Sequence, residues 1–236
     1  MEAIVLAGGF GTRLASRLNN IPKPMALVAG RPFLEILLEH LARCGYTRAI
    51  LSVGYLHEVI EKNFGASFAG ISLDYAVEES PLGTGGAIRA AMERGTRSSM
   101  LVLNGDTYLD VDYGAMMRAH AGAGAAITMA VVEQPDIARY GGVQIEDGRV
   151  VGFEEKGRTG PGWINAGASV IVRELAWRPG LKEKFSFERD VLVPEVARLR
   201  PLAYPTDGFF LDIGVPEDLD RAQTALAKVG NERTRE

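Results

Sequence analysis

The most constraining feature of this sequence is the alternation of two hydrophobic patterns over its first half. Short apolar runs, such as residues 2–7 and 99–103, predict buried strands, and apolar residues at helical spacing, as in 32–44, predict amphipathic helices. Further strands are expected at 48–53 and 71–77, and further helices at 57–64, 84–94 and 112–120. Strands that alternate with helices are typical of a parallel sheet whose connections cross over its faces.

The second half of the sequence changes to a run of short strands. They are expected at 125–133, 142–146, 149–154 and 164–172, and Asp147-Gly148 predicts a tight hairpin turn between the second and third. A helix at 188–199, strands at 201–204 and 208–213, and a closing helix at 217–229 complete the pattern. We expect a single domain over residues 1–229, with a change of topology near residue 133, followed by a flexible polar tail at 230–236.

Composition and charge exclude several classes of protein. The chain has 236 residues and a net charge of -4, and this charge argues against a nucleic-acid binder. Its one cysteine, Cys44, excludes an intrachain disulfide. No apolar run is long enough to cross a membrane and the first residues do not resemble a signal peptide, so we expect a cytoplasmic protein. Residues 1–31 hold four basic side chains against one acidic, whereas residues 206–220 hold five acidic and no basic ones. This asymmetry is compatible with an anion site near the start and a cation site near the end, or with solvated surface charge.

A glycine-rich turn follows the first expected strand. Gly8-Gly9-Phe10-Gly11 allows backbone N–H groups to approach a phosphate, and Arg13 and Lys23 supply cations nearby. The spacing of a dinucleotide-binding loop fails because Leu14 stands where a glycine is needed, and no Gly-Lys-Ser/Thr sequence occurs. The pattern therefore predicts a phosphate-binding loop of another kind.

Four further stretches could carry chemistry. A second glycine-rich turn at 81–87 opens a helix beside Glu78, and is either a ligand-covering loop or a structural one. Asp106 follows a buried strand, where the carboxyl edge of a sheet binds ligands, and its alternative role is to cap a turn. Asp212 interrupts an apolar strand, so it needs a metal, a cationic partner or an exposed edge. The charged stretch 154–156 ends a strand.

Together these stretches resemble the sugar-1-phosphate nucleotidyltransferases, also called NDP-sugar pyrophosphorylases. The matching stretches occur in the family's order between residues 4 and 218: the 8–14 turn with Lys23, the 81–87 turn, Asn104-Gly105-Asp106, Glu154-Glu155-Lys156, Asn165-Ala166-Gly167 and Asp212. The resemblance implies an α/β fold of the Rossmann-like nucleotidyltransferase (GT-A-like) type, with a mixed, mostly parallel central sheet flanked by helices. It also implies a nucleotide-binding half over 1–133 and a sugar-binding half over 134–229.

The resemblance further implies a reaction and its residues. A sugar 1-phosphate attacks the α-phosphorus of a nucleoside triphosphate, pyrophosphate leaves, and Mg²⁺ assists. The implied catalytic residues are Arg13, Lys23 and Asp106, and the implied metal ligands are Asp106 and Asp212. The nucleotide would contact Leu6, Ala7, Gly8, Gly9, Gly11, Thr12, Arg13, Glu78, Gly83, Thr84, Asn104 and Gly105. The sugar phosphate would contact Tyr140, Gly141, Glu155, Lys156, Asn165 and Gly167.

The identity of the base and of the sugar depends on fewer residues. A carboxylate at Glu78 suits the N1–H and N2–H₂ groups of guanine and would repel the carbonyl oxygens of uracil or thymine. Within the family, the stretches 81–87, 184–188 and 210–218 imply GTP and a heptose 1-phosphate, for a bacterial surface polysaccharide such as a capsule. Alternatives are mannose 1-phosphate with GTP, a hexose 1-phosphate with UTP or dTTP, and a catalytically silent nucleotide-sugar-binding subunit. Whether the protein forms a homodimer stays open. The position of Trp163 also stays open, because Gly157 replaces the proline that the family often has after the Glu-Lys pair.

Overall fold

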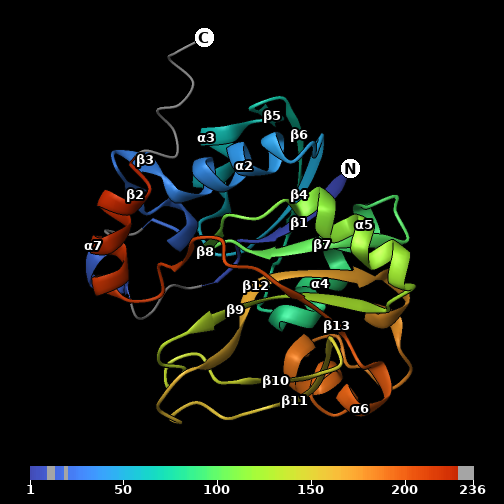
Figure 1. Cartoon of the computed structure of the whole chain (residues 1–236). Coiled ribbons are helices and arrows are strands. Elements are labelled where there is room, and N and C mark those ends of the chain that lie inside the picture. The colour runs from blue at the N-terminus through green and yellow to red at the C-terminus, as the bar shows by residue number, and fades with distance from the viewer. Residues whose placement is uncertain (10–13, 19–20, 228–236) are drawn as a thin grey trace.

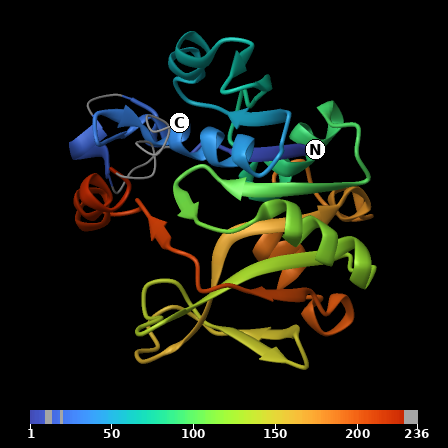
Figure 2. The ribbon, with the colours of Figure 1, turned by 45° about the horizontal axis from the view of Figure 1, so that its top comes forward.

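The fold is built on one ten-stranded mixed sheet. In the computed structural model, which describes residues 1–9, 14–18 and 21–227, the strand order is β10-β11-β13-β9-β12-β7-β1-β4-β6-β5. The expected parallel pairs join β7 (Ser99–Asn104), β1 (Glu2–Leu6), β4 (Arg48–Val53) and β6 (Ile71–Val77). Figures 1 and 2 show β10 and β11 at one end of the molecule and β5 (Ser67–Phe68) at the other.

The second half extends the sheet with antiparallel strands. The strand β12 (Gly162–Val172) runs antiparallel to both β7 and β9 (Ile127–Gln134), and β13 (Leu202–Pro205) pairs parallel with β9. The hairpin of β10 (Val143–Glu146) and β11 (Arg149–Phe153) turns at Asp147 and Gly148, both at positive φ, which confirms the turn. The carboxyl ends of β1, β4, β6, β7, β9 and β13 therefore lie along one edge of the sheet.

Helices cover both faces of the sheet because successive strand residues point to opposite sides. In β1, Ala3 and Val5 pack in a cluster with α2 (Phe33–Arg43), α3 (His57–Phe64) and α5 (Tyr113–Ala123), whereas Ile4 packs in a cluster with α4 (Gly83–Arg94). The turns η3 (Arg173–Trp177) and η4 (Glu188–Leu192) lie on the α4 side. The α/β class and the mixed sheet expected from the sequence are confirmed.

Two predicted elements differ from the structure. The helix expected over 188–199 is broken into a π-helical turn, η4, and the short α6 (Val196–Leu199), because Pro194 has no N–H to continue the helix. The strand expected over 208–213 is the shorter β14 (Phe210–Asp212), which pairs outside the main sheet with an unpredicted strand, β8 (Thr107–Leu109). The closing helix α7 (Pro216–Ala225) begins at a proline, and the predicted tail lies outside the described residues.

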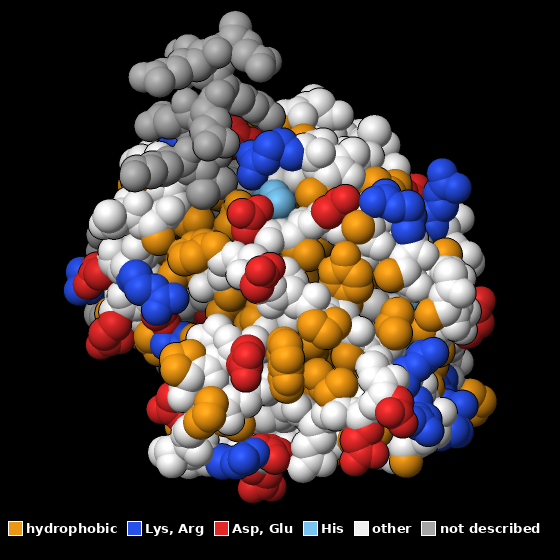
Figure 3. All heavy atoms as spheres, viewed as in Figure 1, with side chains coloured by type: hydrophobic (Ala, Val, Ile, Leu, Met, Phe, Trp, Pro, Cys, Tyr) orange, Lys and Arg blue, Asp and Glu red, His pale blue; other side chains and the backbone are white. Residues whose placement is uncertain are grey.

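The remaining short elements frame the start of the chain. These are α1 (Ala15–Leu18), η2 (Lys23–Met25), β2 (Leu27–Val28) and β3 (Arg31–Pro32). A third apolar cluster, which includes Leu14, Phe33, Leu211 and Leu219, joins this region to β14 and α7. None of the helices in the described parts of the chain is long and apolar enough to cross a bilayer. Figure 3 shows acidic and basic side chains interspersed on the face seen in Figure 1.

Candidate active site

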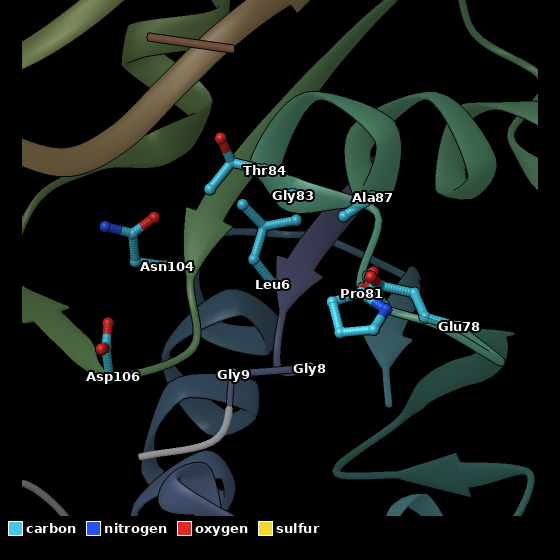
Figure 4. A pocket seen from close by; sticks show the side chains of 11 residues that line it. Leu6, Gly8, Gly9, Glu78, Pro81, Gly83, Thr84, Ala87, Asn104 and Asp106 are labelled. Carbon is cyan, nitrogen blue, oxygen red and sulfur yellow. The ribbon is translucent and has the colours of Figure 1, made fainter. Parts of the chain in front are cut away.

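A pocket of about 360 Å³ opens at the carboxyl edge of the parallel strands. Figure 4 shows Asn104 and Asp106 on one side of it and Glu78 and Pro81 on the other, with Leu6 between them. The predicted nucleotide residues that line it are Leu6, Gly8, Gly9, Glu78, Gly83, Thr84 and Asn104. Three others, Gly11, Thr12 and Arg13, lie outside the described residues. The structure thus brings together residues from the ends of β1, β6 and β7.

Ala7 and Gly105 were also predicted to bind the nucleotide, but neither lines the pocket, and each is hydrogen-bonded beside residues that do. The N–H of Ala7 donates to the carbonyl of Ser52 at 2.7 Å, and the N–H of Gly105 donates to the carbonyl of Leu6 at 2.9 Å. A Cβ at position 105 would lie 2.6 Å from that carbonyl oxygen. The turn that carries Asp106 is therefore held directly against the end of β1.

The 81–87 turn is both a pocket wall and a packing surface. Gly83 has a φ of +71°, and a Cβ there would lie 2.6 Å from the carbonyl oxygen of Phe185. That carbonyl accepts the N–H of Gly85 at 2.9 Å, and the N–H of Phe187 donates to the hydroxyl of Thr84 at 3.0 Å. The glycines therefore permit the start of α4 to lie against the 183–187 segment, which fixes the pocket wall.

Glu78 is held in place by two hydrogen bonds. The Ser52 hydroxyl donates to its Oε1 at 2.9 Å, and the N–H of Leu82 donates to its Oε2 at 3.0 Å. A Cβ at Gly8 would lie 2.8 Å from Oε1, so a larger residue there would require this carboxylate to shift. Each carboxylate oxygen can accept a further hydrogen bond from a ligand.

Asp106 and Asp212 lie close together, with a cation beside each. Strand β14 pairs Asp212 with Thr107, and the N–H of Ile213 donates to the carbonyl of Asp106 at 3.0 Å. The buried Lys23 ammonium forms an ion pair with Asp106, and the guanidinium of Arg139 lies 3.5 Å from Asp212. Burial, and then the charge of Asp106, raises the pKa of the Asp212 carboxyl above its usual value.

These two carboxylates fit a divalent metal. Within the described ranges, no group of three or more His, Cys, Asp or Glu side chains is arranged to hold a metal ion. Mg²⁺ typically binds through one or two carboxylates and completes its shell with substrate phosphates and water. Burial is the main cause of the raised pKa of Asp212, and the second cause is the charge of Asp106, a repulsion that a divalent cation would relieve. Asp106 and Asp212 are therefore the residues that could hold Mg²⁺.

Four of the predicted sugar-phosphate residues come from two segments, 140–141 and 155–156, that lie against each other. The N–H of Gly142 donates to the carbonyl of Glu154 at 3.2 Å, and the reverse bond measures 2.9 Å. This contact places Gly141 beside Lys156, whose Cγ would lie 3.7 Å from a Cβ at position 141. Glu155 and Lys156 are exposed and have no side-chain partner within the described part of the chain. By contrast, Glu154 forms an ion pair with Arg158, and the hydrogen bond from that guanidinium lowers the pKa of Glu154.

Asn165 and Gly167 connect the sugar side to the nucleotide side. The register of β9 and β12 shifts between Asn165 and Ser169, and the N–H of Gly167 donates to the Asn165 side chain at 3.0 Å. A Cβ at Gly167, whose φ is +74°, would lie 3.0 Å from Nδ2 of Asn104. A smaller hollow of about 160 Å³ is lined by Asn165 and Gly167, and shares Leu6, Thr84 and Asn104 with the main pocket.

Sequence reasoning missed two residues of this site. Ser52 anchors Glu78, but a serine inside an apolar strand carries no local signal of that role. Arg139 lies over the ring of Tyr140, donates to its hydroxyl at 2.6 Å, and forms ion pairs with Asp212 and Asp218. The only signal for Arg139 was a basic residue next to the predicted Tyr140-Gly141 pair.

Fold and site define a nucleotidyl transferase, and comparison with known proteins agrees. The model of the nucleotidyl transferase family matches residues 2–229, and the chain belongs to this family. The chain is 41% identical over 226 residues to a D-glycero-alpha-D-manno-heptose 1-phosphate guanylyltransferase of Aneurinibacillus thermoaerophilus, covering 96% of this chain and 98% of the relative. It is also 41% identical to a protein of the same name from Campylobacter jejuni, over 92% of this chain and 96% of the relative.

A solved structure supports the assignment to the same family. HddC from Yersinia pseudotuberculosis, in complex with GMP-PN, matches with a TM-score of 0.84 and 38% identity, over 94% of this chain and 97% of HddC. The family resemblance expected from residues 4–218 is therefore confirmed.

Proposed function

We propose that this protein transfers a guanylyl group from GTP to D-glycero-α-D-manno-heptose 1-phosphate, giving GDP-heptose and pyrophosphate. The observation that carries the proposal is that the glycine-walled pocket, lined by Asp106, lies beside Asp212, and that Arg139 joins Asp212 to the 140–141 segment against which Lys156 lies. The two relatives named heptose 1-phosphate guanylyltransferases, matched over nearly their whole length, support this choice of substrates. GDP-heptose made in the cytoplasm would feed the assembly of a surface polysaccharide.

Residues 1–133 would then form the nucleotide-binding half and residues 134–229 the sugar-binding half. Glu78 stands at the end of the pocket that would receive the base, and Asp106 at the end that would receive the phosphates (Figure 4). Lys156, beside Gly141, would hold the phosphate of the sugar 1-phosphate. Glu155 and Asn165 would accept hydrogen bonds from the hydroxyl groups of the sugar.

The reaction brings two polyanions together. Two unit charges 4 Å apart repel by about 4 kcal/mol at an effective dielectric constant of about 20, which is about three powers of ten in rate. Lys23 and Lys156 reduce this repulsion, and Arg13 is proposed to do the same at the triphosphate. When bound by Asp106 and Asp212, Mg²⁺ neutralises phosphate charge and aligns the reacting groups.

The bond changes need no covalent intermediate with the protein. An oxygen of the sugar phosphate forms a bond to the α-phosphorus of GTP. The bond from that phosphorus to the oxygen that bridges it to the β-phosphorus breaks, and the electron pair leaves on pyrophosphate. The work of the protein is therefore positioning and charge compensation.

Pyrophosphate release tests the proposal directly. Purified protein with Mg²⁺ is assayed with GTP, ATP, UTP and dTTP, each crossed with heptose, mannose and glucose 1-phosphates. We expect kcat/KM for GTP with heptose 1-phosphate to exceed that of every other pair by about tenfold or more. A preference for another pair would keep the reaction and replace the substrates, and no release by folded protein would favour a catalytically silent nucleotide-sugar-binding subunit.

Glu78→Gln is expected to weaken the use of GTP. A glutamine keeps one acceptor but turns the other into a donor, so guanine loses a charged acceptor, and kcat/KM for GTP should fall about 10- to 100-fold. The values of kcat/KM for UTP and dTTP should rise relative to the value for GTP. Glu79→Gln is the matched control, because Glu79 is exposed and does not line the main pocket. An unchanged ratio of GTP to UTP use would remove Glu78 from base selection.

A further inference from the structure

A separate hollow of about 560 Å³ opens at the same edge of the sheet, where β9 and β13 end and β12 begins. Its lining combines two aromatic rings, Trp163 and Phe210, with four polar side chains: Glu133, Gln134, Thr206 and Asp207. It shares no lining residue with the 360 Å³ pocket. It is therefore not needed to account for the nucleotide.

The hollow lies next to the residues proposed to hold the sugar phosphate. Phe210 and Asp212 are two residues apart on β14, so their side chains share one side of the strand about 7 Å apart. The ring of Phe210 packs against Tyr140 with centroids 5.6 Å apart, and Tyr140 precedes the Gly141 that touches Lys156. The separation of Asp212 from Phe210 is comparable with the span of a pyranose ring from its anomeric oxygen to its exocyclic carbon. A sugar whose phosphate lies near Asp212 and Lys156 can thus direct its exocyclic chain into this hollow.

The chemistry of the lining suits a polyol chain. Such a chain presents C–H groups, which pack on aromatic rings, and O–H donors, which need acceptors. Glu133 and Asp207 are exposed, and neither carboxylate has a hydrogen bond or ion pair with another residue in the described ranges. These free carboxylates would accept hydrogen bonds from hydroxyl groups and would repel a phosphate. An uncharged hydroxylated chain therefore fits better than a second nucleotide.

We propose that this hollow receives the exocyclic chain of the sugar 1-phosphate, and that Trp163 favours heptose over mannose by covering the additional CHOH unit. The proposal rests on the proposed function and deepens it, because the two sugars are alike around the ring. Contact of one additional carbon with an apolar side chain in a pocket discriminates by about 10- to 200-fold. The sequence left the position of Trp163 open, and the proposal places this side chain against the exocyclic chain of the sugar.

The chain offers a matched pair of variants, because it contains only two tryptophans. Trp177 lies at the end of η3, 40% exposed, with Arg173 over its ring. Trp163→Ala should lower the heptose-to-mannose ratio of kcat/KM by about tenfold or more, whereas Trp177→Ala should change it by less than about threefold. An equal loss for both sugars in Trp163→Ala, or the same change of ratio in Trp177→Ala, would overturn the proposal.

A binding measurement keeps the proposal testable even if Trp163→Ala fails to fold. In the Trp177→Phe variant, Trp163 is the single indole, and its emission reports on this hollow. With GMP-PN and Mg²⁺ present, heptose 1-phosphate should shift or quench the emission saturably, and mannose 1-phosphate should do so less. Unchanged emission at heptose 1-phosphate concentrations that saturate the wild-type enzyme would overturn the proposal.

Failure of this inference can be told apart from failure of the proposed function. If wild-type protein uses heptose 1-phosphate but Trp163 affects neither the ratio nor the emission, only the assignment of the hollow is wrong. If wild-type protein uses mannose 1-phosphate and not heptose 1-phosphate, the proposed substrate is wrong, and the assignment of the hollow fails with it.

Discussion

Asp106→Asn is expected to lower kcat for pyrophosphate release by about three powers of ten. The substitution removes one of the two carboxylates that could hold Mg²⁺ and leaves the buried Lys23 ammonium without its ion-pair partner. Charge stabilisation by a bound metal contributes several kcal/mol to reactions of this kind, and about 4 kcal/mol corresponds to this loss of rate. The amide oxygen that replaces the carboxylate can still accept a hydrogen bond from the buried Lys23 ammonium, so the free energy of unfolding should fall by only about 1–3 kcal/mol.

The measurement combines pyrophosphate release with a thermal unfolding midpoint. Asp110→Asn is the matched control, since Asp110 is an exposed carboxylate that follows the same turn but lines neither the main pocket nor the smaller hollow. The control should retain activity within about threefold of the wild-type protein, as expected of a surface substitution. An Asp106→Asn protein with near-normal kcat would show that Asp106 does not take part in the reaction.

The parts of the fold that sequence could predict are those whose signals are local. The alternation of Ala3, Ile4 and Val5 between two faces, and the helical spacing in α2, follow from which side chains must be buried. The Asp147-Gly148 turn follows from the positive φ that its two residues adopt. These features depend on neighbours within a few residues, so their pattern is visible in the chain itself.

The parts that sequence could not predict depend on partners far apart along the chain. The break of the expected 188–199 helix at Pro194 is an exception, because the missing N–H of a proline is a local signal in the sequence. The pairing of β14 with β8 places Asp212 beside Asp106 without any local sign of that register. Arg139 acquires its role only because α7 and β14 bring Asp218 and Asp212 to it.

The same distinction applies within the site. Asn104-Gly105-Asp106 was expected at the sheet edge because it directly follows an apolar strand, and the structure places Asn104 and Asp106 there. The dual use of the 81–87 turn was not decidable from sequence, because it depends on contact with Phe185 about a hundred residues later. Packing against that segment and lining of the pocket are both properties of the same glycines.

Gly83→Ala is expected to destabilise the fold and weaken GTP binding together. A non-glycine residue at a φ of +71° costs about 1–2 kcal/mol, and an added methyl group in a tightly packed place costs about 1–3 kcal/mol. The two costs act at one atom, the Cβ that would lie 2.6 Å from the Phe185 carbonyl oxygen. The unfolding midpoint should therefore fall by roughly 5–15 °C for a chain of this size.

The change also displaces the pocket wall, because Gly83 lines the pocket and opens α4. A shift of about 1 Å in a positioning segment can cost about a hundredfold in activity, so kcat/KM for GTP should fall even where the variant is fully folded. Gly122→Ala is the matched control: it lies in α5 with no atom within 4 Å of an added Cβ. There the same methyl group should stabilise the helix by up to about 1 kcal/mol. Equal unfolding midpoints for the two variants would contradict the strain at Gly83, and a destabilised Gly83→Ala protein with normal KM for GTP would separate the packing role of this turn from nucleotide binding.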